Sequence, residues 1–393
     1  MWSKLFVIVF CFMVSGFSDS ELFGRSRKKC EPCKMVVIAP VADVRVKAEP
    51  VKKGVIAPAL SGDIGGQLTQ VFLGDHVLGT NIPGKKKWMS VDVLGQKVFT
   101  NKKTLTDKDT FVPLTGFMKK SQLAQVSDFL QHTIVLRNLW TPLYKRPDVK
   151  SKILKHVCMG TVLGAKKFNG NWLVAFVGNK KYYLTWPAGI GVLHEFNQDS
   201  DISKKIDALR NNIIKTALQL VGTPYVLGGR SGAGNMAGQI LGIDCSKFTS
   251  LAYLAGAGLT IPCNSTSQKC ACTQLLTGAD LKPADLIFFH DDTCKSINHV
   301  ALYLGDGMML ESAIPTKEVI YFAQDAKKYG VDLKDCCVKK ISVKERIGVD
   351  VKKIKNGKTR ALDGRRIMLG SLLNSEEKIK KMRLLACGRD VSW

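Results

Sequence analysis

The chain has 393 residues, of which 45% are apolar, and its formal net charge is +25. This length and apolar content exclude a wholly disordered chain and predict two or three packed domains. The lysines are spread along the chain rather than gathered in one tail. Such a surface suits an anionic partner, namely cell-wall polymer, membrane or nucleic acid, or it reflects a general lysine bias without a partner.

The N-terminus has the pattern of a secretory signal peptide, which we predict to span residues 1–20. Lys4 precedes an apolar run from Leu5 to Phe17, and small residues follow at the expected cleavage site. The run is short for a transmembrane helix, and an uncleaved anchor is the alternative. No later segment approaches the roughly 18 apolar residues of a membrane span, so we expect a secreted or periplasmic protein without stable membrane insertion. Export, and the lack of a nucleic-acid-binding motif, count against nucleic acid as a partner.

Two β-rich blocks follow a polar, basic linker at residues 21–34. Residues 35–121 and 134–196 contain short runs of β-branched and aromatic residues broken by Gly and Pro, which predict strands. Each block has the size of a small β-barrel. Between the blocks, the spacing of apolar residues in 122–133 predicts a short amphipathic helix.

A third domain is predicted over residues 201–345. Apolar residues at steps of three and four predict a helix over 201–221, and a second helix is expected from Cys245 to about Ala255. The expected strands are 285–289, 299–304 and 308–312. Helices first and strands after describe an α+β domain with helices packed against an antiparallel sheet. Residues 346–393 form a C-terminal extension whose role the sequence does not indicate.

Of the twelve cysteines, ten remain when Cys11 of the predicted signal peptide and Cys245 are set aside. We expect some of them to form structural disulfides in an oxidising compartment, with a metal site as the alternative. Four of them, Cys263, Cys270, Cys272 and Cys294, follow soon after the second predicted helix, and we expect these to form structural bridges. A single Cys-x-x-Cys pair, at residues 30–33, is insufficient for zinc. We predict no resident metal and no cofactor.

Cys245 and His299 are the candidate nucleophile and base of a thiol hydrolase. Gly242-Ile-Asp-Cys leads into the second helix, and unpaired N–H groups at a helix N-terminus lower the pKa of a cysteine there. The N–H of Cys245 can also stabilise an oxyanion. His299 opens an apolar strand, so its ring would project from the sheet edge. Singly, each residue is more often part of the core, but the joint pattern favours a Cys–His pair.

The segments around these residues resemble the NlpC/P60 cysteine peptidases. The resemblance rests on GTPYVLGG at 222–229, GIDCS at 242–246, LKPADLIFF at 281–289 and INHVALYLG at 297–305. It implies an α+β papain-like catalytic domain preceded by two small all-β SH3-like barrels, similar to the γ-D-glutamyl-L-diamino-acid endopeptidases. It further implies hydrolysis, without a cofactor, of the bond after γ-D-Glu in peptidoglycan stem peptides.

The resemblance also implies a third catalytic residue that orients the imidazole, which in this family is a polar residue on the next strand and often a second histidine. Twelve residues after His299 this chain has Glu311. A hairpin across 305–307 would bring Glu311 beside the strand of His299. A carboxylate there can accept a hydrogen bond from the imidazole and stabilise its cation. The alternative is an exposed glutamate on an edge strand.

Four further residues are implied to bind substrate. Asp244 matches the aspartate that binds the free amino group of L-Ala, and its alternative role is that of a helix N-cap. Ser246 and Tyr225 belong to the same subsite, and Ser265 falls where the family has a hydroxyl near γ-D-Glu. Asp75 is a candidate for a second carboxylate facing the amine.

Several positions depart from the family pattern. The departures are Lys247 for glycine, Leu227 for tryptophan, Cys263 for arginine and Ala284 for glycine. With a long loop at 230–241 they indicate a divergent substrate site, although none removes a catalytic atom. Two alternatives therefore stay open: an amidase or acyltransferase using the same Cys–His pair, and an inactive protein that binds the anionic cell wall through its β domains.

Overall fold

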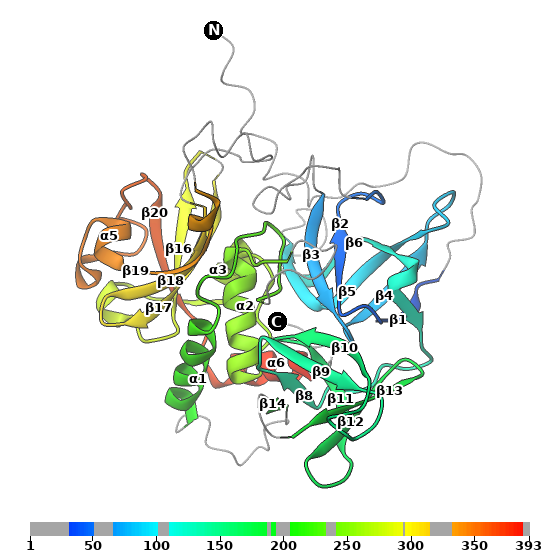
Figure 1. Ribbon diagram of the computed structural model, residues 1–393. Helices are drawn as coiled ribbons and strands as arrows, with labels where there is room; N and C mark the ends of the chain where they lie inside the picture. Colours follow the sequence, from blue (N-terminus) through cyan, green and yellow to red (C-terminus); the bar gives the residue numbers. More distant parts are fainter. Residues whose placement is uncertain are drawn as a thin grey trace.

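The structure is a computed structural model in which three sheets surround a central helix, α2 (Figure 1). It describes residues 31–50, 66–100, 110–186, 190–193, 205–232, 241–293, 295–314 and 332–387. The predicted signal peptide and most of the predicted linker lie outside these residues. In Figure 1 the third sheet lies on one side of α2 and the two N-terminal sheets lie on the other.

The first sheet has the strand order β3-β2-β6-β5-β4-β1-β7, and its pairs are antiparallel. Its strands are β1 (Cys33–Val37), β2 (Val41–Arg45), β3 (Gln67–Phe72), β4 (His76–Asn81), β5 (Trp88–Thr100), β6 (Thr110–Lys119) and β7 (Leu123–Gln125). The predicted helix over 122–133 is wrong. Leu123 is instead buried in the core of this sheet, and β7 pairs with β1, so tertiary pairing overrides a weak helical periodicity.

The second sheet has the order β10-β9-β13-β12-β11-β8-β14. Its strands are β8 (Ile134–Leu136), β9 (Trp140–Tyr144), β10 (Ile153–Cys158), β11 (Val162–Lys167), β12 (Trp172–Val177), β13 (Lys180–Thr185) and β14 (Ile190–Val192). Alternate residues of β12 and β13, such as Leu173, Ala175, Tyr182 and Leu184, form its core. Two sheet-rich units thus precede the third sheet, and their likeness to SH3-like barrels stays a prediction.

The third sheet has the order β15-β20-β16-β17-β18-β19 and confirms the three strands expected in this region. Its strands are β15 (Thr273–Gln274), β16 (Leu286–Asp291), β17 (Ser296–Gly305), β18 (Met308–Ala313), β19 (Cys337–Ser342) and β20 (Arg366–Ser371). The hairpin expected across residues 305–307 is present, with Leu302 opposite Leu310 and Tyr303 opposite Met309. Because β20 pairs with β16, the segment after residue 345 is part of this sheet.

The helices are mostly packed against this third sheet. They are α1 (Ile206–Leu218), α2 (Cys245–Ala257), α3 (Ser265–Ala271), α5 (Val343–Ile347) and α6 (Glu376–Ala386), with 3₁₀ turns η3 (Lys120–Gln122), η5 (Gly278–Asp280), η6 (Leu333–Asp335) and η7 (Val351–Lys353). The main core joins α1, α2 and α6 to the inner face of the sheet through residues such as Ile213, Phe248, Phe288, Val300 and Met382. Gly256 allows α1 and α2 to cross closely, since a Cβ there would lie 2.7 Å from the Ile213 Cα.

Both N-terminal sheets dock on the unit formed by the third sheet and its helices, which we call the catalytic-type unit. In the first sheet, the Phe99 N–H donates to Ser267 Oγ at 2.7 Å. In the second, Arg137 Nε donates to the Ala255 carbonyl of α2 at 2.9 Å. Gly160 permits this approach, because it has a φ of +81° and a Cβ there would meet Leu251 at 2.3 Å. The sheets therefore hold α2 from one side while the third sheet holds it from the other.

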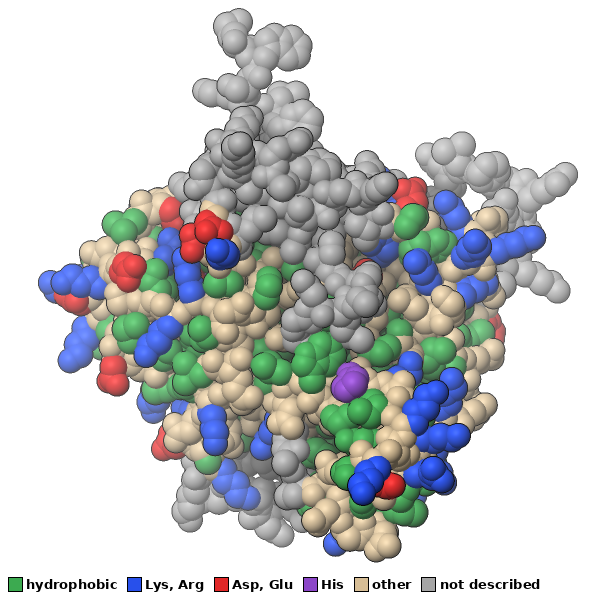
Figure 2. Space-filling view, in the orientation of Figure 1, with side chains coloured by type: hydrophobic (Ala, Val, Ile, Leu, Met, Phe, Trp, Pro, Cys, Tyr) green, Lys and Arg blue, Asp and Glu red, His purple; other side chains and the backbone are tan. Residues whose placement is uncertain are grey.

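The surface agrees with the dispersed positive charge of the sequence. Figure 2 shows Lys and Arg side chains scattered over the visible face, with fewer acidic side chains among them. None of the helices in the described ranges has the length and hydrophobicity of a transmembrane span.

Candidate active site

The turn into α2 is organised by Asp244. As the N-cap, its Oδ1 accepts hydrogen bonds from the Lys247 N–H and the Ser246 hydroxyl, both at 2.8 Å. Its Oδ2 accepts from the Gly228 N–H at 3.0 Å. The N-cap role weighed for Asp244 is therefore confirmed. The same bonds fix the backbone that presents Cys245 as the first residue of the helix.

Cys245 is nearly buried, with 8% of its surface exposed, and it lies in the main core beside β17. Burial raises the pKa of its thiol to about 12, and the Asp244 carboxylate adds to this. Hydrogen bonds from the Val300 and Ser246 N–H groups act in the opposite direction but are weaker. The expected lowering of the pKa by the helix N-terminus is therefore outweighed. The resting group is a thiol, which needs a base before it can attack.

His299 and Glu311 form a buried pair between β17 and β18. His299 Nε2 lies 2.7 Å from Glu311 Oε2, and the two residues are 7% and 1% exposed. Burial opposes ionisation of Glu311, but His299 and then Arg346 outweigh it and lower the Glu311 pKa to about 2. Burial lowers the pKa of His299, although Glu311 raises it in part. At neutral pH the pair is thus a carboxylate and a neutral imidazole.

This pairing fixes the tautomer of the imidazole. A carboxylate can only accept hydrogen bonds, so Nε2 carries the proton and Nδ1 is the free acceptor. Val300, the residue after His299, donates its N–H to the Cys245 thiol. The structure therefore brings the nucleophile beside the strand of the base, in the interior of the sheet rather than at the edge that we expected. Glu311 is likewise buried, which excludes the exposed edge glutamate.

The residues predicted to bind substrate lie around this centre. Burial raises the Tyr225 pKa, and the nearby Cys245 and Asp244 side chains add to this effect. Ser246 lies beside Asp244, as described above, and Ser265 Oγ donates to the Ile297 carbonyl of β17 at 2.9 Å. Asp244, Ser246 and Ser265 thus lie at the starts of α2 and α3, and Tyr225 lies near Asp244.

Asp75, considered as a second carboxylate facing the amine, is engaged in an ion pair, and its role toward substrate stays a prediction. Its Oδ2 accepts from Arg230 Nη1 and from the Phe72 N–H, each at 2.9 Å. Arg230 also stacks on the Phe72 ring, with its guanidinium carbon 4.5 Å from the ring centroid. Asp75 therefore forms a buried ion pair between the first sheet and the catalytic-type unit.

Two of the departures from the family pattern contact each other. Lys247 is buried, and its Nζ donates to the Cys263 carbonyl. For Cys263 and Cys272, the expectation of structural disulfides among the cysteines near the site is wrong, since both carry free thiols. Cys263 packs beside Val98, whereas Cys272 packs on Gly370, so the fold separates them. Cys294 lies outside the described residues.

The sequence analysis missed Arg346, which donates from Nε to Glu311 Oε2 at 3.3 Å. Only its place in a basic segment marked it, and that is a weak signal. Within the described ranges, no three His, Cys, Asp or Glu side chains are grouped so as to hold a metal ion. Chemically, the arrangement offers a thiol, a neutral base with a fixed tautomer, and helix N–H groups.

Comparison with known proteins identifies this unit. The NlpC/P60 family model matches residues 222–333. A γ-D-glutamyl-L-lysine dipeptidyl-peptidase of Bacillus cereus is 29% identical over 62% of this chain, and its Bacillus subtilis counterpart is 28% identical over 64%. The matches span 66%, just under two thirds, and 74% of those relatives.

A solved structure of an NlpC/P60 family protein from Bacillus cereus has the same fold. It aligns with a TM-score of 0.55 at 21% identity and covers 79% of this chain and 94% of its own. The catalytic-type geometry, the family match and this fold agree. Residues 222–333 of the chain therefore form a domain of the NlpC/P60 family.

Proposed function

We propose that this protein is a secreted cysteine endopeptidase that hydrolyses the bond between γ-D-Glu and the diamino acid in peptidoglycan stem peptides. The observation that carries the proposal is the buried His299–Glu311 pair beside the strand residue that contacts Cys245. The names of the two Bacillus relatives support the choice of bond, and they include L-Lys as the diamino acid. The signal-like N-terminus supports secretion.

In the proposed mechanism, His299 Nδ1 accepts the Cys245 proton as the sulfur attacks the γ-carbonyl carbon of D-Glu. Glu311 stabilises the imidazolium that forms, because its carboxylate stays ionised. The first N–H groups of a helix have no partner within it, so the Cys245 N–H can stabilise the oxyanion. His299 then protonates the leaving amine, and a water molecule, activated by the same imidazole, hydrolyses the thioester.

The substrate side of the proposal rests on charge and position. Asp244 is the carboxylate placed to attract the ammonium of L-Ala, with Ser246 and Tyr225 beside it. Ser265 lies next to β17, where it can contact γ-D-Glu. The dispersed positive charge favours the anionic cell wall as the wider partner.

The test is mass spectrometry of L-Ala-γ-D-Glu peptides that end in diaminopimelate or L-Lys, and of their N-acetylated forms, after incubation with the mature protein. We expect cleavage of the free-amine peptides alone, and none with Cys245→Ala. Equal cleavage of the acetylated peptides would show that Asp244 does not select for a free amino group. No cleavage by folded, reduced protein would favour the wall-binding alternative.

A further inference from the structure

The catalytic carboxylate has a second partner from outside the family-matched region. Glu311 accepts from His299 and also from Arg346 of α5, at 2.7 Å and 3.3 Å. Arg346 lies beyond residue 333, where the family match ends. Both contacts reach the same oxygen, Oε2, of a side chain that is 1% exposed. A buried carboxylate oxygen shared between an imidazole and a guanidinium has little freedom to rotate.

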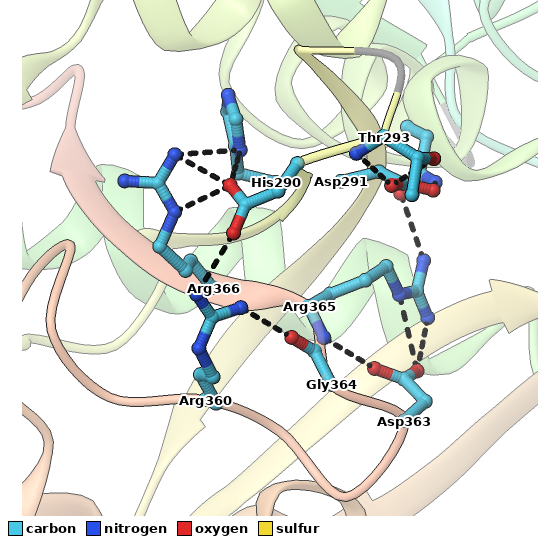
Figure 3. A network of polar contacts seen from close by, with 10 residues as sticks. His290, Asp291, Thr293, Arg360, Asp363, Gly364, Arg365 and Arg366 are labelled. Atoms are coloured by element: carbon cyan, nitrogen blue, oxygen red, sulfur yellow. Dashed lines mark hydrogen bonds and ion pairs between the residues drawn. The ribbon is translucent and has the colours of Figure 1, made fainter.

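Arg346 is itself held in place. Its Nη1 donates to Asp363 Oδ2 at 2.9 Å, and Arg365 donates to the same oxygen from Nη2 at 2.6 Å. Burial opposes ionisation of Asp363, but these two arginines hold its pKa well below the usual range. Figure 3 shows Arg365 on Asp363, with Arg360 and Arg366 nearby. Arg360 and Arg366 both contact Asp292. Asp363 therefore connects two arginines of the C-terminal segment.

The same two arginines lie against the wall of the active site. Their guanidinium carbons are 4.8 Å and 4.9 Å from the centroid of the Phe289 ring, for Arg346 and Arg365 respectively. That ring is 5.2 Å from the His299 ring. Among the described residues, the charged groups that act on His299 are thus Glu311 from β18, Arg346 from α5 and Arg365 from the segment before β20. Cys245 of α2 lies in the same core as Val300, the next residue of β17.

We propose that Arg346, anchored by Asp363, is the positioning residue of this centre, which holds Glu311 against His299 and offsets its charge. The proposal rests on the proposed peptidase function and assigns a role to the segment that follows the family match. The C-terminal extension then supplies a residue that positions the catalytic carboxylate.

The charge has a consequence with a definite sign. A buried carboxylate beside a histidine favours the imidazolium, whereas nearby cations favour the neutral ring. Arg346 and Arg365 lower the pKa of His299, in addition to burial. Removing Arg346 leaves the negative charge of Glu311 less compensated. It also takes away one cation that repels the protonated form of His299. Both changes raise the pKa of His299, so less of the base is neutral at a given pH.

The experiment compares Arg346→Gln with the wild type by two readouts. The first is the NMR titration of the six histidines, with His299 assigned through His299→Ala, and it needs no substrate. We expect the His299 midpoint to rise by about half to one pH unit. The second is cleavage of L-Ala-γ-D-Glu-diaminopimelate, where we expect kcat to fall about tenfold or more with KM within about twofold.

Matched variants separate positioning from general damage. Arg346→Lys keeps the charge and should restore most of the midpoint but less of kcat, because lysine cannot form the same fork of hydrogen bonds. Arg360→Gln, which breaks a neighbouring pair on Asp292, should change neither readout. Asp363→Asn loosens Arg346 without touching Glu311 and should shift the midpoint in the same direction. If Arg346→Gln does not fold, the His299 midpoint in Asp363→Asn tests the proposal instead.

A double variant tests whether Arg346 acts through Glu311. In a Glu311→Gln background, Arg346→Gln should cost little further kcat. The proposal is overturned if the His299 midpoint and kcat are unchanged in Arg346→Gln, or if the two losses multiply. If the wild type cleaves no peptide, the proposed peptidase function is refuted. The histidine titration would still decide the role of Arg346.

Discussion

Two buried carboxylates in the third sheet and its flanks are held in different ways. Asp285 and Glu311 are each 1% exposed. Asp285 accepts from Arg210 Nη1 at 2.8 Å, from the Ser371 hydroxyl at 2.6 Å and from the Lys282 N–H at 2.9 Å. All its partners are permanent donors. Glu311 instead has an imidazole as its nearest partner, with a guanidinium behind it.

The difference separates scaffold from chemistry. The Arg210–Asp285 pair joins α1 to the start of β16 and, through the Ser371 hydroxyl, to the end of β20. The Glu311 cluster contains the one partner that can gain and lose a proton near neutral pH. The first arrangement should therefore control stability, and the second should control rate and pH dependence.

The largest expected effect breaks the second arrangement. His299→Ala should lower kcat/KM by about 10³-fold or more, because the thiol loses its base. Stability should change much less, since Glu311 keeps Arg346 as a partner. Peptide-cleavage kinetics and thermal melts check both statements. His290→Ala, which removes a histidine of the polar network outside the site, serves as the control and should keep activity within about twofold.

The next effect breaks the first arrangement. Arg210→Met leaves the buried Asp285 charge without its cation and should cost about 3–5 kcal/mol of unfolding free energy. Urea denaturation measures this cost, and kcat per folded molecule should stay unchanged. Lys380→Gln, in an exposed pair with Glu376, should cost about 0.5 kcal/mol or less. A large loss of kcat in folded Arg210→Met would contradict the separation of roles.

The third prediction sharpens the comparison through pH. Glu311 raises the pKa of His299 against the effect of burial. In Glu311→Gln that support is lost, so the pKa should fall and the acid limb of kcat/KM should move to lower pH by about one unit. This shift is opposite in sign to that expected for Arg346→Gln. Profiles of kcat/KM against pH that move in the same direction for both variants would refute the assignment of the two charges.

The smallest effect concerns the turn before Asp285. Ala284 has a φ of +69°, which is strained for a residue with a side chain, and glycine is usual here in the family that the sequence resembles. Ala284→Gly should relieve this strain at the loss of one buried methyl group. We expect a net stabilisation of about 1 kcal/mol or less, measured by urea denaturation. Destabilisation by more than about 1 kcal/mol would show that the turn is not strained.

The sequence allowed much of the catalytic unit to be predicted, because its signals are local. The start of α2, the β17–β18 hairpin and the pairing of Glu311 with His299 follow from short-range patterns of capping, turns and strand register. The helix expected over 122–133 failed because a few apolar residues also suit an edge strand, and pairing with β1 decides between them.

Other features depend on contacts between distant segments. The high pKa of Cys245 comes from its burial in the main core, which no local pattern shows. Arg346 lies 35 residues after Glu311 and reaches it only because α5 folds back beside β18 and β19. Asp75 meets Arg230 across an interface that the sequence does not reveal.

The most direct test of the central claim is intact-protein mass spectrometry during turnover of L-Ala-γ-D-Glu-diaminopimelate, quenched in acid. The account predicts a transient thioester of L-Ala-γ-D-Glu on Cys245, visible as the mass of that dipeptide less one water. Glu311→Gln should change how fast the adduct forms, and Cys245→Ala should show none. Cleavage without any adduct on Cys245, or with equal rate in Cys245→Ala, would contradict the account.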